Sequence, residues 1–420
     1  MKIIADFHIH SKYSRATSRD MDVATLARYA EMKGIHLLGT GDFTHPQYFA
    51  ELKGALDPLG NGLFKLRNSP SPVHFILTVE VSNIFSVGKG KSKRVHTVLF
   101  APSFEVAEKI NLCLARCGKL GSDGRPIFGM HVKDIVKLVL DVSPDCLIVP
   151  AHAWTPWFSV FGSESGFDSL EECFEEQSKN IYAIETGLSS DPAMNWRVSS
   201  LDRITLLSNS DSHSPSRIGR EANVFDCKMD YFEIVEVIKT GDPKRFLHTI
   251  EFFPEEGKYH LDGHRNCQVV LEPRVSREHD FMCPKCGRKL TLGVMHRVEE
   301  LADRPEGARP PGKIPFKNMV PLDEIIADAL GQSVGTKAVD KEYGRMIQGL
   351  GPELEILFER TAEELRPHAP ARVLDGILKV REGKIKIEPG FDGVYGKVCV
   401  FRDEDAKAAA AAGGSQMELF

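Results

Sequence analysis

Two short motifs, one at the start and one in the middle of the chain, each place reactive side chains two positions apart. His8-x-His10 and Asp211-x-His213 both follow apolar, strand-like runs. Side chains at positions i and i+2 of an extended chain point to the same face, so each motif presents two donors together. Imidazole and carboxylate donors in this arrangement are typical of zinc or manganese sites.

More residues of the same types end other strand-like runs. They are Asp42, His45, Glu80, His96 and His152. One such histidine alone is more often a structural residue, but the repetition favours a metal centre gathered at the strand ends of a parallel barrel. The nine candidate ligands exceed the four that one zinc takes. The sequence therefore predicts two or three ions, with Glu80 as a bridge.

Clustered divalent ions favour phosphoester hydrolysis, because they activate water and hold both the attacking and the leaving oxygen of a phosphoryl group. The protein then supplies mainly ligands and needs no side-chain nucleophile. The candidate catalytic residues are Glu80, His45, Asp211 and His213. Of these, His45 or His213 is suited to carry a proton to the leaving oxygen.

The order of these motifs resembles the polymerase and histidinol phosphatase (PHP) superfamily. The residues that carry the resemblance are His8-x-His10, Gly39-Thr-Gly-Asp42, Glu80, His96, Pro150-Ala-His152 and Ser210-Asp211-Ser-His213. It implies an α/β fold, a distorted (β/α)7 barrel with a trinuclear metal site. The chain departs from many relatives at 14–18, where an acidic ligand is missing, and at Phe43, where they have histidine.

A second metal motif follows the expected barrel. His264-x-x-Cys267 and Cys283-x-x-Cys286 are separated by fifteen residues, a spacing typical of a zinc ribbon with one histidine in place of cysteine. The alternative is a redox pair at Cys283 and Cys286, unrelated to the other two residues. The remaining cysteines of the nine are scattered, which favours reduced thiols over a disulfide framework.

The region after the ribbon predicts helices near 322–330, 340–349 and 361–368, then a glycine-rich β segment. The loop 331–337 suits either a phosphate or a plain helix cap. This order of modules resembles endonuclease Q, a DNA repair nuclease of the PHP superfamily. The predicted divisions are a metal-dependent barrel at 1–255, a zinc-binding module at 256–300, a helical and β domain at 301–402, a flexible tether at 403–415 and a terminal peptide at 416–420.

Two groups of residues are candidates for contacts with DNA. Trp154, Trp157 and Phe158 follow His152 and either pack beneath a loop or wall a pocket for a flipped base. Lys91, Lys93 and Arg94 precede His96 and either form a solvated loop or contact phosphates.

The terminal peptide resembles the Gln-x-x-Leu-Phe motif by which bacterial repair proteins bind the sliding clamp. Its key residues are Gln416, Leu419 and Phe420, and the preceding Ala/Gly stretch reads as a tether. The alternative is a frayed terminus.

Composition is that of an ordinary folded protein, with 42% hydrophobic and 27% charged residues in 420. The net charge of −6 argues against a strongly basic coat but not against DNA, since bound cations would neutralise several acids. Without an apolar run or a signal pattern, we expect a monomer in the cytoplasm, associated with the nucleoid when bound to DNA.

The resemblance to endonuclease Q implies incision of DNA on the 5′ side of a deaminated base (uracil, hypoxanthine or xanthine) or of an abasic site. The expected partners are damaged DNA and the sliding clamp. The expected cofactors are Zn²⁺, with Mn²⁺ or Mg²⁺ also suited to the active site. One alternative is a small-molecule phosphatase with the same ligands, for which the later modules are superfluous. The other is a clamp-tethered DNA-binding module without activity, against which the intact ligand set argues.

Overall fold

A mixed sheet forms the centre of the chain, which the computed structural model describes over residues 1–88 and 92–401. Lys91, the 403–415 tether and the 416–420 peptide lie outside the described residues. The strands are β1 (Lys2–Asp6), β2 (Leu37–Gly39), β3 (Leu56–Pro58), β4 (Phe64–Leu66), β5 (His74–Ser86), β6 (Ser92–Ala101), β7 (Ile127–Phe128), β8 (Leu147–Pro150), β9 (Ala183–Glu185), β10 (Thr205–Leu207), β11 (Ala222–Asp226), β12 (Phe246–Glu251), β13 (Asp262–His264), β14 (Val269–Leu271), β15 (Phe316–Asn318), β16 (Lys386–Glu388) and β17 (Lys397–Cys399).

The central sheet has eleven strands and runs β15-β12-β11-β1-β2-β5, with β4 and β3 beyond β5. Strand β6 joins β5 to β8, and β7 also pairs with β5. The sequence predicts a barrel of parallel strands, whereas the observed sheet is mixed, since β1 pairs antiparallel with β11 and β5 pairs antiparallel with β6. A separate parallel pair, β9 and β10, lies between β8 and β11. The amide of Ala153 donates to the carbonyl of Glu185 on one side, and the side chain of Asn223 binds Ser208 on the other.

Apolar side chains fill both faces of the central strands. Along β1, Ile3 and Ala5 belong to one buried cluster and Ile4 to another. This alternation follows from the two-residue period of a strand, and burial on both faces explains the continuous apolar runs in the sequence.

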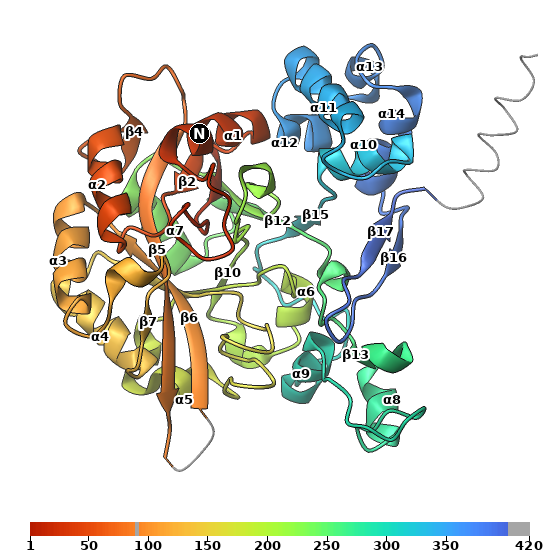
Figure 1. The fold of residues 1–420 in the computed structure, drawn as a ribbon, viewed down its shortest axis with the longest axis horizontal. Coiled ribbons are helices and arrows are strands. Elements are labelled where there is room, and N and C mark those ends of the chain that lie inside the picture. Colours follow the sequence, from red (N-terminus) through yellow and green to blue (C-terminus); the bar gives the residue numbers. More distant parts are fainter. Residues whose placement is uncertain (89–91, 402–420) are drawn as a thin grey trace, which may run out of the picture.

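Some helices cover the outside of the sheet, and others form a separate group beside the sheet-containing body (Figure 1). The helices are α1 (Val23–Lys33), α2 (Pro46–Ala55), α3 (Phe104–Leu114), α4 (Val132–Val142), α5 (Leu170–Phe174), α6 (Pro192–Asn195), α7 (Tyr231–Thr240), α8 (Pro273–Glu278), α9 (Val294–Leu301), α10 (Leu322–Leu330), α11 (Lys337–Leu350), α12 (Glu353–Phe358), α13 (Ala362–Leu365) and α14 (Ala371–Arg381). The predicted helix at 322–330 coincides with α10, and Gly331 caps its end in the left-handed conformation.

The segments after β12 return to the sheet-containing body at several points. Strand β15 pairs with β12, and a buried ion pair joins Lys33 of α1 to Glu353 of α12. The hairpin β16–β17 lies between the group α10–α14 and the region of α8 and α9 (Figure 1). These contacts fix the later modules beside the body instead of leaving them tethered to it.

Over the described ranges, none of the helices combines the length and the apolar composition needed to cross a membrane.

Candidate metal centre

The His8-x-His10 and Asp211-x-His213 motifs lie against each other. An isolated parallel bridge joins Ile9 to Ser212, the central residues of the two motifs. The amide of His10 donates to the carbonyl of Ser212 at 2.9 Å. Because the flanking residues of each motif share one face, this bridge aims His8, His10 and Asp211 at the same point.

These three side chains and Glu80 form the first candidate cluster, in which one ligand atom from each lies within 4.8 Å of the others. Oδ1 of Asp211 is 3.1 Å from Nε2 of His10 and 3.6 Å from Nε2 of His8. Oε2 of Glu80 is 3.2 Å and 3.5 Å from the same two nitrogens. Two imidazoles and two carboxylates around one point are a fitting ligand set for a divalent transition metal.

The second candidate cluster joins Glu80 to His96 and His152. Oε1 of Glu80 is 2.6 Å from Nδ1 of His96 and 3.1 Å from Nε2 of His152. The two oxygens of Glu80 therefore face different clusters. A carboxylate placed in this way can bridge two metal ions, as the sequence predicted for Glu80.

Unpartnered polar atoms show that the first cluster fits a metal ion. Nε2 of His8, Nε2 of His10 and Oδ1 of Asp211 are buried and lack a hydrogen-bond partner among the described residues. A buried polar atom without a partner costs free energy, so three that converge on one point fit the binding of a cation.

The electrostatics of the first cluster support the same reading. Burial disfavours charge on His8, yet the carboxylates of Glu185, Glu80 and Asp211 hold its pKa well above the ordinary value. Burial likewise opposes the charge of Glu80, but His96, Arg125 and His8 hold its pKa well below the ordinary value. The carboxylates of the cluster thus stabilise positive charge beside them, which is the role that a bound metal ion would take.

In His8 and in His10, the ring nitrogen that points away from the cluster binds a buried carboxylate. Nδ1 of His8 donates to Glu185 at 2.9 Å, and Nδ1 of His10 donates to Asp42 at 3.1 Å. Donation from Nδ1 leaves the lone pair of Nε2 directed at the cluster, as in many metal sites. Glu185 is a site residue that the sequence analysis did not predict. It ends the apolar strand β9. Glu80 was predicted from the same pattern, a carboxylate after an apolar run, so this pattern could also have indicated Glu185.

Asp42 stands behind His10, and the structure does not bring it into either cluster. Its second oxygen accepts hydrogen bonds from the amide and hydroxyl of Ser11, each at 2.6 Å, and from Ser14 at 2.9 Å. With both oxygens occupied, Asp42 orients His10 instead of contacting a metal. The sequence predicted Asp42 as a ligand, and in the structure it lies behind His10, with Ser14 bound to it.

Two further predicted residues also lie outside the clusters. His45 stacks on Tyr13 with ring centroids 4.3 Å apart, and its Nδ1 is buried without a hydrogen-bond partner in the described chain. His213 lies with its ring 4.4 Å from that of His10, and its Nδ1 binds the carbonyl of Asp211 at 2.9 Å. His213 is partly exposed beside the first cluster, which leaves it placed for proton transfer rather than for ligation there.

Three site residues have a strained backbone. Asp42, His152 and Asp211 have φ of 47°, 31° and 46°, in the left-handed region that residues with a Cβ rarely adopt. Strain of this kind persists where the surroundings enforce it, and it is concentrated at functional sites.

Arg125 is a site residue that sequence reasoning missed. Its guanidinium donates to Oε2 of Glu80 at 2.9 Å, and its side chain is 29% exposed. It comes from the loop before β7, and no pattern in the sequence distinguishes it from other arginines. A partly exposed cation at the edge of the clusters is placed to contact a phosphate oxygen of a substrate.

A cavity of about 330 Å³ opens beside the second cluster. Its wall includes His96, His152, Trp157, Phe158 and Tyr259. The ring of Phe158 is 4.6 Å from that of His96. Trp157 and Phe158, which the sequence predicted for a pocket wall, thus line a cavity beside the second cluster.

Trp154 is a core residue, which corrects its predicted place in the pocket wall. Its side chain is 1% exposed, its indole donates to Asn195 at 2.8 Å, and its ring packs on Phe161 at 4.7 Å. The sequence spacing could not separate it from Trp157, which is 38% exposed.

Lys93 and Arg94, the predicted basic residues before His96 that the structure describes, both contact other residues of the chain. Nζ of Lys93 donates to the carbonyl of Gly166 and lies 4.3 Å from the ring centroid of Phe167. The guanidinium of Arg94 lies 5.4 Å above the ring of Phe158. Arg94 thereby reaches the cavity wall, whereas Lys93 is held away from it.

The second metal motif is also assembled. His264, Cys267, Cys283 and Cys286 place their ligand atoms within 4.8 Å of one another. Burial opposes the thiolate of Cys283, but the amides of Lys285 and Cys286 lower its pKa to about 6. Their geometry favours a metal site over the alternative in which Cys283 and Cys286 act apart from the other two.

Comparison with known proteins gives matches along almost the whole chain. A family model described as the MJ0043 C-terminal domain matches residues 321–384. The chain is 34% identical to the uncharacterized protein MJ0043 of Methanocaldococcus jannaschii over 254 residues, which is 59% of this chain and 31% of that protein. It thus spans less than a third of that relative. It is 29% identical to the uncharacterized protein YqxK of Bacillus subtilis over 94% of this chain and 99% of YqxK.

Two solved structures are also similar. The lesion-specific endonuclease PfuEndoQ of Pyrococcus furiosus superposes with a TM-score of 0.84 at 31% identity, covering 97% of this chain and 99% of its own. Endonuclease Q in complex with a 27-mer duplex that carries an abasic lesion at the active site superposes with a TM-score of 0.84 at 32% identity, covering 96% and 98%.

Proposed function

The chain belongs to the endonuclease Q family, and from this premise we propose that it is a metal-dependent DNA endonuclease that cuts beside damaged bases. The observation that carries the proposal is the pair of ligand clusters that share Glu80 at the edge of a cavity. Such a pair is suited to phosphodiester hydrolysis. We further propose that the ring of strands from β1 to β11 is the distorted (β/α)7 barrel of the PHP superfamily.

We assign the first metal position to His8, His10, Glu80 and Asp211, and the second to Glu80, His96 and His152. When bound, divalent ions would activate a water and stabilise negative charge on the phosphoryl oxygens. Glu185 and Asp42 hold His8 and His10 in the orientation that ligation needs. Arg125 lies beside the shared carboxylate and is suited to bind a non-bridging phosphate oxygen.

The proton that the leaving oxygen requires is assigned to His213. Burial lowers its pKa, while the nearby Asp211 opposes that effect. The ring is partly exposed, so it can take up a proton from solvent and deliver it to the leaving oxygen at the mouth of the site. His45, held under Tyr13, has no comparable access.

For the substrate, we propose DNA that carries uracil, hypoxanthine, xanthine or an abasic site, cut on the 5′ side. The cavity beside the second cluster supports this reading, since a nucleotide extruded from the duplex needs a pocket next to the scissile phosphate. Extrusion costs least where pairing is already weak, as at a deaminated base. Trp157 and Phe158 then supply the apolar wall.

The test is incision of end-labelled duplexes with one uracil, hypoxanthine or abasic site, with Mg²⁺, Mn²⁺ and Zn²⁺ assayed separately. We expect cleavage immediately 5′ to the lesion with at least one of these ions, and none after chelation. An undamaged duplex of the same sequence is the control. Efficient hydrolysis of small phosphomonoesters with no cleavage of any duplex would instead establish the phosphatase alternative.

Two tryptophans three positions apart provide a matched pair of variants. Trp157→Ala should lower the ratio of kcat/KM for uracil-containing over undamaged duplex by roughly tenfold, the loss of one base-stacking contact, with little change in unfolding. Trp154→Ala should instead lower the free energy of unfolding by about 3–5 kcal/mol, as expected for a buried aromatic side chain. For both variants, denaturant titrations measure the free energy of unfolding, and incision kinetics on uracil-containing and undamaged duplexes measure the ratio of kcat/KM. The assignment fails if the two effects are exchanged.

The sliding clamp remains the partner that we propose for the terminal peptide, on the sequence of Gln416, Leu419 and Phe420 alone. A module without activity, in which the metal sites are only structural, is disfavoured by the two clusters that share Glu80 beside an open cavity.

A further inference from the structure

The hairpin between β16 and β17 has a tip whose backbone is fixed to the segment 255–265. The amides of Gly390, Gly393 and Gly396 donate to the carbonyls of Glu255, Lys258 and Glu256 at 2.8, 2.8 and 3.0 Å. A Cβ at Gly396 would lie 2.1 Å from the carbonyl of Glu255. The approach is thus too close for any residue other than glycine, and the tip cannot pivot freely.

A side chain and a core residue secure the tip further. Asp392 accepts hydrogen bonds from the amide of Arg265 at 2.7 Å and from the hydroxyl of Thr291 at 2.6 Å. Phe391 is 7% exposed and pairs through its backbone with Leu261. The candidate zinc module, which supplies Arg265 and Thr291, therefore holds the tip in place.

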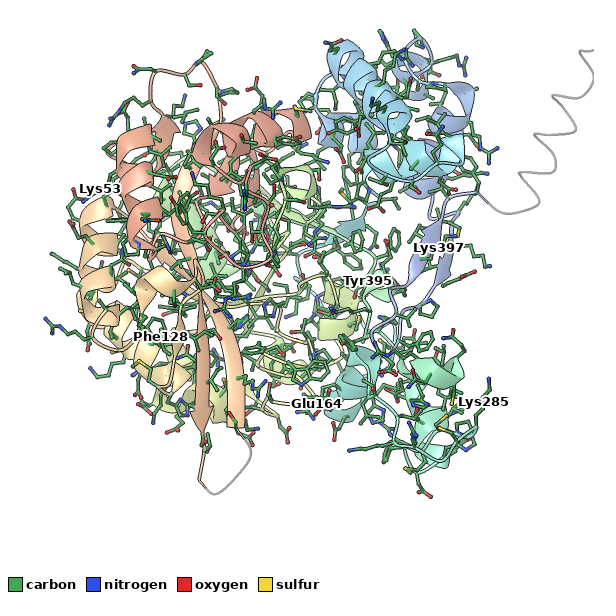
Figure 2. The ribbon with its side chains drawn as sticks, in the orientation of Figure 1. Lys53, Phe128, Glu164, Lys285, Tyr395 and Lys397 are labelled. Atoms are coloured by element: carbon green, nitrogen blue, oxygen red, sulfur yellow. The ribbon has the colours of Figure 1, made fainter. Side chains whose placement is uncertain are left out.

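On this fixed support Tyr395 is 72% exposed, and its neighbour Val394 is 36% exposed. Figure 2 places Tyr395 on the side of the hairpin that faces the sheet-containing body. A large aromatic side chain displayed on a rigid tip loses little conformational freedom on binding, so it is suited to contact a partner.

The surroundings of Tyr395 identify the kind of partner. Nζ of Lys258 lies 5.8 Å from the ring of Tyr395 and 5.6 Å from that of Tyr259. Tyr259 in turn packs edge-on against Trp157, 5.3 Å between ring centroids, and both line the cavity beside the second cluster. A run of aromatic rings with an interposed cation thus leads from the metal clusters to the surface.

Aromatic rings beside an exposed lysine are the pattern by which proteins stack on bases while they neutralise phosphates. The geometry points to Tyr395 as a stacking residue that packs on a base of the duplex next to the extruded nucleotide, with Lys258 on the adjoining phosphate. This inference rests on the proposed function and assigns the part of the site that binds DNA outside the pocket. An apolar protein partner is disfavoured, because the exposed lysine lies between the two tyrosine rings.

The test compares Tyr395→Ala with Tyr395→Phe in binding to a duplex with one abasic site, under conditions that prevent cleavage. Tyr395→Ala should weaken binding roughly tenfold, and Tyr395→Phe should bind as the unaltered protein does, since stacking needs the ring and not the hydroxyl. A 2-aminopurine beside the lesion should lose fluorescence with the unaltered protein and Tyr395→Phe, but not with Tyr395→Ala.

The variant Lys258→Ala tests the contribution of charge to DNA binding separately from the contribution of stacking. It should weaken binding by a similar factor and lower the slope of log Kd against log salt concentration by about one, whereas Tyr395→Ala should leave that slope unchanged. Binding by Tyr395→Ala equal to that of the unaltered protein, or an equal loss in Tyr395→Phe, overturns the inference. If the unaltered protein itself ignores lesion-bearing duplexes, the proposed function has failed, and the two failures are distinguished.

Discussion

Glu80→Gln is expected to lower kcat/KM for incision roughly 1,000-fold or more and to reduce the metal content of the purified protein. The substitution keeps the shape of the side chain but removes the one charge that both clusters share. Charge stabilisation by metal ions contributes several kcal/mol to such reactions, and each 1.4 kcal/mol is a factor of ten in rate. Elemental analysis and incision kinetics on the same preparation measure both effects.

Glu108→Gln on α3 is the matched control for this variant. Glu108 is exposed and pairs with Lys53 at 3.2 Å, so its charge is screened and its loss should change neither activity nor metal content. Circular dichroism of Glu80→Gln should confirm a native fold. Near-normal activity with a full metal complement would remove Glu80 from its bridging role.

Which residues carry the chemistry could be read largely from the sequence, because ligand types recur after apolar runs. Six of the nine predicted ligands lie in the two clusters; they are His8, His10, Glu80, His96, His152 and Asp211. How they are positioned could not be read in the same way. Glu80 and His96 lie inside the long antiparallel strands β5 and β6, not at strand ends, because the two strands continue past both ligands and stay paired as far as Ser86 and Ser92.

Residue type alone also cannot tell a ligand from the group that orients it. Asp42 and Asp211 both follow apolar runs, yet one is saturated by His10, Ser11 and Ser14 while the other keeps an unpartnered oxygen. The distinction arises from hydrogen bonds between segments that are remote in sequence. Arg125 went unpredicted for the same reason, since only the fold brings it to Glu80.

Cys283→Ser is expected to remove one zinc ion per chain and to unfold the module around the second metal motif while the central sheet stays intact. The buried apolar core of that module consists of only Val269, Cys283 and Leu290 among the described residues. A core of this size cannot fold the segment alone, whereas structural zinc contributes roughly 10–16 kcal/mol in small zinc domains. Limited proteolysis should therefore begin cutting within residues 262–291 of the variant.

Cys117→Ser is the control, because Cys117 is an exposed cysteine outside the cluster. It should keep the zinc content and the proteolysis pattern of the unaltered protein. If Cys283→Ser does the same, the four residues are not a structural zinc site.

Cys283→Ser should also weaken DNA binding, because the module holds the hairpin between β16 and β17 in place. Arg265 and Thr291 belong to the module and hold Asp392, so unfolding the module releases the tip that carries Tyr395. Affinity for a lesion-bearing duplex should then fall by at least as much as in Tyr395→Ala. Hydrolysis of a small phosphodiester such as bis(p-nitrophenyl) phosphate should persist, because none of the ligands of the catalytic clusters comes from the module. Loss of both activities together would instead show that the module supports the catalytic clusters directly.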